Sequence, residues 1–226
     1  LGRTDPRARS SRAEELAASN GGPTIPLSAT TWPYAEERIA ALFDHPEVGD
    51  LVVVHTPAGT SPAKGGSHGN FDVTQARSPL VVSGAGIVPV DGSPVGSWTD
   101  AVRLVDVAPT VAKALGVATV QGVRLDGTKG PTYLSRQDGR PLDAILDGTT
   151  ARQAVIFVCD GMSHTRLREL VEAGRLPNLA KLIQQGGFFR SGAVGNFPSN
   201  TYPGHNVVGT GAWSAHHGLL DNRWYR

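Results

Sequence analysis

The sequence predicts an α/β fold in which a mostly parallel sheet is flanked by helices on both faces. Residues 51–54 and 155–158 are short runs of Val, Ile, Leu and Phe, a composition typical of strands covered on both faces. Residues 35–43, before the first run, and residues 104–115, between the two runs, carry apolar side chains at helical spacing. The second run leads directly to Asp160, and the carboxyl ends of strands are where open α/β sheets bind ligands.

The remaining elements follow in chain order. Residues 1–30 are rich in Arg, Ser, Ala and Gly, which predicts a loop or the remnant of a preceding segment. Residues 55–70 form a loop rich in Gly, Pro and Ser, and residues 78–84 read as a further strand. Downstream of Asp160, residues 163–173 are expected to be helical, and Pro177 to separate that helix from the next one.

Thr201 is expected at the start of a helix, because Pro203 is well placed as the first helical residue. Free N–H groups and the positive end of the helix dipole favour a bound anion at that position, so the Thr201 hydroxyl is expected to face a phosphate or sulfate. A neutral threonine hydroxyl is a poor nucleophile, and no Ser-His-Asp spacing supplies a base nearby. Asp160 is a natural ligand for a divalent cation, so metal activation is the simplest interpretation.

Four motifs in this order resemble the amino-terminal catalytic third of the type I phosphodiesterase/nucleotide pyrophosphatase family, within the alkaline phosphatase superfamily. The resemblance implies that Asp160 ligates one of two divalent metal ions, expected to be zinc. It further implies that Thr201 is the metal-bound nucleophile and that Asn222 donates to a phosphoryl oxygen. Ser199 is the less favoured nucleophile, because the family's reactive hydroxyl directly precedes an aromatic-Pro pair. The motifs are Val158-Cys159-Asp160-Gly161, Phe197-Pro198-Ser199-Asn200-Thr201-Tyr202-Pro203-Gly204-His205, Gly209-Thr210-Gly211 and His216-His217-Gly218-Leu219-Leu220-Asp221-Asn222.

Residues 31–150 resemble the carboxyl-terminal segment of the same superfamily, through shorter and more common strings. There the strand matching residues 51–54 is followed by an Asp-His metal pair, whereas this chain has Pro57 and Ala58. His68 matches a later histidine that completes the other metal site. The resemblance thus implies an incomplete alkaline-phosphatase-like fold in which residues 31–150 have lost the metal pair and residues 151–226 carry the nucleophile.

Two architectures explain why a carboxyl-type segment precedes an amino-type segment. In a tandem arrangement, residues 1–150 close one copy and residues 151–226 open another, with residues 125–150 as the connector. In a circular permutation, His68 folds back to the site of Asp160 and Thr201. The chain does not begin with Met and stops shortly after the last motif, so we expect a piece of a longer protein.

Composition limits the partners. The 226 residues carry 21 basic and 20 acidic side chains, a net charge of +1, which argues against a large nucleic-acid footprint. No apolar run approaches the roughly 18 to 20 residues of a membrane span. The single cysteine excludes an internal disulfide. We therefore expect a small phosphodiester or nucleotide substrate.

The sequence predicts a metal-dependent phosphoryl-transfer hydrolase that cleaves phosphodiester or pyrophosphate bonds through Thr201, with Asn222 stabilising the transferred group. The alternative is a non-catalytic or incomplete fragment of the same fold with at most an anion site or a single-metal site. Each candidate also has an ordinary structural role: Asp160 as the cap of the following helix, Thr201 as a cap hydroxyl, and Asn222 as a turn residue. Three candidate metal ligands are thus named: Asp160, Thr201 and His68.

Overall fold

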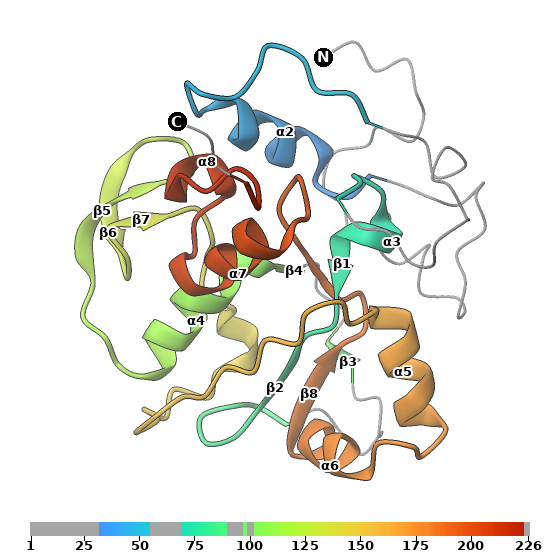
Figure 1. Cartoon of the computed structure of the whole chain (residues 1–226). Helices are drawn as coiled ribbons and strands as arrows, with labels where there is room; N and C mark the ends of the chain where they lie inside the picture. Colours follow the sequence, from blue (N-terminus) through green and yellow to red (C-terminus); the bar gives the residue numbers. More distant parts are fainter. Residues whose placement is uncertain (1–31, 55–68, 90–96, 99–101, 224–226) are drawn as a thin grey trace, which may run out of the picture.

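The computed structural model describes residues 32–54, 69–89, 97–98 and 102–223, and it is a mixed α/β arrangement of small sheets and helices (Figure 1). Two of the sheets are built around strands from the carboxyl-terminal segment. In each, the central strand has one antiparallel and one parallel neighbour. The first sheet has β9 (Ala193–Val194) between β1 (Arg77–Ser78) and β4 (Val102–Arg103), and the second has β8 (Gly186–Phe189) between β2 (Val81–Ser83) and β3 (Ser97–Trp98).

A third sheet lies apart from these two, at the left of Figure 1. Its central strand β5 (Val120–Arg124) pairs antiparallel with β6 (Lys129–Thr132) and parallel with β7 (Arg136–Gln137). Residues 120–137 therefore form a compact sheet of their own, which packs next to the helices that carry the carboxyl-terminal motifs. Directly after β7, Asp138 N and Gly139 N both donate to Gly211 O, at 2.9 and 3.2 Å.

The expectation of a mostly parallel sheet is not confirmed, since each of the three sheets combines one antiparallel and one parallel pair. Of the three runs predicted to be strands, residues 51–54 and 155–158 form no strand in the described part of the chain, whereas residues 81–83 of the run 78–84 form β2. Val155 and Phe157 are 69% and 87% exposed, and Figure 1 draws the segment before α5 as a coil. Apolar composition predicts burial, whereas a strand also needs neighbours for its backbone hydrogen bonds.

Most predicted helices are confirmed. Helix α2 (Ala35–Phe43) has the predicted bounds, and α4 (Val107–Ala114) continues the 3-10 turn η4 (Leu104–Asp106). Helix α5 (His164–Glu172) begins after Ser163, whose hydroxyl accepts from Arg166 N at 3.4 Å. Helix α6 begins at Pro177, as expected for a residue that lacks an N–H. Helix α6 spans Pro177–Gln185. The remaining helical elements are α3 (Val73–Ala76), η5 (Asp143–Ile145), α7 (Thr201–Thr210) and α8 (Ser214–His217).

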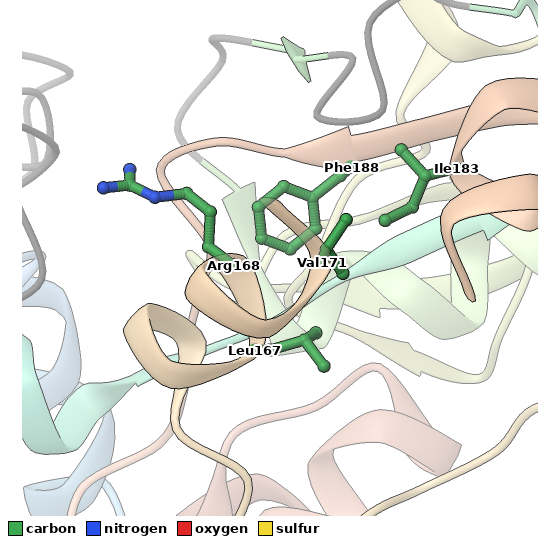
Figure 2. A pocket seen from close by; sticks show the side chains of 5 residues that line it. All are labelled: Leu167, Arg168, Val171, Ile183 and Phe188. Carbon is green, nitrogen blue, oxygen red and sulfur yellow. The ribbon is translucent and has the colours of Figure 1, made fainter. Parts of the chain in front are cut away.

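The best-defined apolar cluster joins α5 and α6 to β8. Figure 2 shows the Phe188 ring next to Leu167 and Val171 of α5, with Ile183 of α6 beside it. The Arg168 guanidinium points away from these side chains, as expected for a long side chain that covers apolar surface with its stem. The hollow among the five residues has no room for a water molecule, so it is packed core rather than a binding site.

Arg38 of α2 joins its helix to the loops around Phe71 and Asn196. Its side chain is 1% exposed, and its guanidinium donates to the carbonyl oxygens of Pro33, Phe71 and Asn196 at 3.2, 3.0 and 3.2 Å. The guanidinium also lies 4.3 Å from the centre of the Phe71 ring. Burial lowers the pKa of Arg38 to about 9, opposed by Asp72 and Glu37. One buried side chain thus holds together three segments that are far apart in sequence.

Among the described residues, no helix has both the length and the apolar composition needed to cross a lipid bilayer.

Candidate functional site

The site is built on the start of α7. The helix begins at Thr201, two residues before the predicted start at Pro203, and Asn200 is its N-cap residue. The early start is possible because Pro203 falls in the first turn, where an N–H has no intrahelical acceptor. The Tyr202 N–H is bound to Asn222, so within the described residues the Thr201 amide is the remaining N–H donor of this turn. The expected anion-binding position therefore has one main-chain donor rather than several.

Asp160 and Thr201 lie next to each other, as the sequence predicts. The Thr201 hydroxyl donates to Asp160 Oδ2 at 3.3 Å, and the Asp160 carboxylate is exposed to solvent. The alternative role of Asp160 as the cap of α5 is not observed, because Ser163 occupies the N-cap position. A carboxylate oxygen and a hydroxyl oxygen at this separation are two hard donors suited to the same divalent cation.

Asn222 also lies at the start of α7. Its Oδ1 accepts from Tyr202 N at 2.8 Å, so the segment after α8 is held against the first turn of the helix. The adjacent Asp221 Oδ1 accepts from Asn200 Nδ2 at 2.5 Å and from Asn222 N at 2.6 Å. The contact between Asn200 and Asp221 was not predicted from the sequence. Asn200 is a residue type that favours the N-cap position, so its place before the helix could have been predicted. Spacing along the chain does not predict that Asp221 is its partner.

The loop that leads into Thr201 is supported from two sides. Asn196 is 1% exposed, and its amide nitrogen donates to Pro198 O at 2.5 Å and to Ser214 Oγ at 3.1 Å. On the other side, Gly69 N donates to Ser199 Oγ at 3.2 Å. Ser199 therefore binds the upstream segment. His68, which precedes Gly69 in the sequence, lies outside the described residues.

The two histidines that end α8 face different surroundings. His216 lies between two carboxylates, with Nδ1 at 2.5 Å from Asp138 Oδ2 and Nε2 at 3.0 Å from Asp44 Oδ2. The His217 Nδ1 accepts from Leu219 N at 3.2 Å, and burial lowers the pKa of this histidine. The His217 contact with Leu219 lies in the segment that leads from α8 to residues 221–222.

The donor set for a metal is incomplete in the described part of the chain. No group of three or more His, Cys, Asp or Glu side chains capable of holding a metal ion occurs there. Asp160 and Thr201 supply two oxygen donors, whereas a catalytic zinc ion takes about three protein ligands. These residues fit part of the coordination of one divalent cation.

Part of the chain matches the model of a known protein family. Residues 154–226, which include Asp160, Thr201 and Asn222, match the model of an enzyme family of phosphodiesterase and pyrophosphatase type. The family is type I phosphodiesterase / nucleotide pyrophosphatase, and the match is consistent with a fragment of that family. No curated protein and no solved structure in the comparisons matches the chain.

Proposed function

We propose that the site at the start of α7 belongs to a metal-dependent hydrolase that cleaves phosphodiester or pyrophosphate bonds of a small substrate, with Thr201 as the nucleophile. The observation that carries the proposal is the 3.3 Å contact between Thr201 Oγ1 and Asp160 Oδ2 at the exposed start of a helix. Such a position favours an anionic substrate through the helix dipole. The family match over residues 154–226 supports the same reaction class.

Each residue then has a role that follows from its position. Asp160 accepts the hydrogen bond of the Thr201 hydroxyl, which orients the oxygen that attacks phosphorus. The Thr201 amide and the NH₂ group of Asn222 are the donors available to the phosphoryl oxygens that gain charge in the transition state. Attack by Thr201 Oγ1 on a phosphodiester forms a threonyl phosphodiester and breaks the bond to the leaving alcohol, which departs with the hydroxyl proton. Water then cleaves the bond between Thr201 Oγ1 and phosphorus, restores the hydroxyl and releases a phosphomonoester.

The proposed cofactor is a pair of divalent metal ions, with zinc as the expected metal. Asp160 and Thr201 would hold one ion, and a bound cation would favour the alkoxide form of Thr201. His68 is the proposed ligand of the other ion.

The test is hydrolysis of bis-p-nitrophenyl phosphate by the full-length protein with added zinc. Thr201→Ala should abolish turnover and leave the circular dichroism spectrum unchanged, because the substitution removes the attacking atom from an exposed position. Thr128→Ala is the matched control: it deletes another exposed threonine hydroxyl that donates to an aspartate, to Asp126 Oδ1 at 2.7 Å, and should keep turnover within about threefold. Ser199→Ala deletes the less favoured nucleophile and should keep measurable turnover. Full activity in Thr201→Ala, or a loss of activity confined to Ser199→Ala, would refute the assignment of the nucleophile.

A second candidate function is favoured by the incomplete donor set among the described residues. In that case the segment retains the family fold and binds an anion or a single cation at the start of α7 without turnover. Equilibrium dialysis against zinc separates the two, since the catalytic proposal requires two ions per full-length protein.

A further inference from the structure

Asp221 is an exposed residue with no assigned role in the proposed reaction. We propose that it is a positioning residue, whose carboxylate fixes Asn222 relative to Thr201; this inference rests on the proposed function of the site. Asp221 Oδ1 accepts from Asn200 Nδ2 at 2.5 Å and from the main-chain N–H of Asn222 at 2.6 Å. A single oxygen therefore joins the N-cap residue of α7 to the residue proposed to contact the substrate.

The hydrogen bonds surround the nucleophile on both sides. Asn200 and Tyr202 are the sequence neighbours of Thr201, and they bind Asp221 and Asn222 respectively. We call these four residues, Asn200, Tyr202, Asp221 and Asn222, the α7 clamp. Because consecutive residues of one segment hold both neighbours of Thr201, a shift of the 221–222 loop cannot occur without loss of at least one of these bonds.

The clamp also determines which way the Asn222 side chain is turned. A main-chain N–H can bond only to the oxygen of a carboxamide, so the Tyr202 N–H fixes Oδ1 toward the helix. The NH₂ group is then directed away from that amide and is the part of the side chain left to donate to a phosphoryl oxygen. Release of the clamp would free the amide to turn over, and an acceptor oxygen would then face the anionic substrate.

A carboxylate at position 221 suits this task for two reasons. Hydrogen bonds to an ionised acceptor are shorter and stronger than neutral ones, which agrees with the 2.5 and 2.6 Å distances. A negative charge is also stabilised near the amino terminus of a helix. The geometry itself needs only an acceptor oxygen at Oδ1, which the carboxamide of an asparagine also provides, and this separates positioning from metal binding.

The first experiment measures amide hydrogen exchange by NMR in the 226-residue chain. Asp221→Ala should speed amide exchange at the Tyr202 N–H about tenfold. The substitution removes the one or two hydrogen bonds that hold Asn222, whose Oδ1 is the acceptor of that N–H. Asp221→Asn should stay within about threefold of the parent, because its Oδ1 accepts from the same two donors. The matched control is Asp147→Ala, which removes another exposed carboxylate that accepts a main-chain N–H, from Thr149 at 2.7 Å.

The second experiment measures turnover of bis-p-nitrophenyl phosphate by the full-length protein. Asp221→Ala should lower kcat by about 10- to 100-fold with KM nearly unchanged, since misplacing a group that acts in the transition state costs rate rather than binding. Asp221→Asn, and the exchanged pair Asn200→Asp with Asp221→Asn, should restore kcat to within about threefold of the parent. Asp147→Ala should match the parent.

The outcomes separate the two proposals. The positioning role is overturned if exchange at Tyr202 is unchanged in Asp221→Ala. It is also overturned if Asp221→Asn lowers the affinity for zinc, because that result would identify Asp221 as a metal ligand. A parent protein without zinc-dependent turnover refutes the proposed function, while the exchange measurement still decides whether the clamp exists. Equal loss of kcat in Asp221→Ala and Asp221→Asn shows that the charge acts, and this also overturns the inference.

Discussion

His164 should make the stability of this protein fall as the pH is lowered from neutral. The ring is 2% exposed, stacks on Phe188 with centroids 4.9 Å apart, and has Nε2 at 2.9 Å from Arg190 O. Burial, together with the cationic side chains of Arg77 and Arg168, lowers the pKa of His164 to about 3. The folded protein therefore keeps this ring neutral at a pH where the unfolded chain binds a proton.

The sign and size of this pH dependence of stability follow from the folded and unfolded pKa values of His164. Between the ordinary pKa of 6.5 and the folded value of about 3, the unfolded state binds more protons, so the free energy of unfolding rises with pH. The contribution is fully present above 6.5 and is lost as the pH falls. At pH 5, protonation of an unfolded histidine with that pKa stabilises the unfolded state by about 2 kcal/mol. Because α5 begins at His164, expulsion of the ring would also displace the loop that carries Asp160.

Urea unfolding at pH 7.5 and pH 5.0 tests this prediction in the parent and in His164→Gln. Glutamine can still donate toward Arg190 O but does not titrate, so the variant should lose about 2 kcal/mol less stability between the two pH values. Other carboxylates and histidines titrate equally in both proteins and cancel in the comparison. An identical pH dependence of the two proteins would refute the reasoning and would show that His164 is open to solvent in the folded state.

Four further predictions concern the site and the packing. Asp160→Asn should lower the zinc content of the purified full-length protein, because an amide is a weaker ligand than a carboxylate; metal analysis by mass spectrometry measures it. The 226-residue chain alone should bind at most one zinc ion weakly in a calorimetric titration and show no turnover, since two tight sites need more donors than Asp160 and Thr201. Gly139→Ala should destabilise by about 3 kcal/mol or more in urea unfolding, because its Cβ would lie 1.9 Å from Val105 O. Arg38→Met should cost about 2 to 4 kcal/mol in the same assay, since it leaves three buried carbonyls without their donor.

Local sequence determined the helices and the position of Thr201. Residues 35–43 form a helix with the predicted bounds, because apolar periodicity and the turn at Pro33 and Tyr34 act over a few residues. Pro177 begins α6 for the equally local reason that it lacks an N–H. Thr201 lies at the start of its helix and next to Asp160, as the ordered motifs predict.

Long-range pairing decided the rest. Residues 155–158 have the composition of a buried strand, yet Gly186–Phe189 pairs with β2 and β3 instead, because a strand forms only where neighbours supply hydrogen bonds. His164 is buried against Phe188, a residue of that same central strand, and this contact depends on how α5 packs on the sheet. The bond between Asn200 and Asp221 joins residues whose proximity depends on how α7 and α8 pack, which no local pattern encodes. Motif spacing along the chain predicted which residues are candidates for the site. Only the packing of distant segments decided which of these residues lie next to one another.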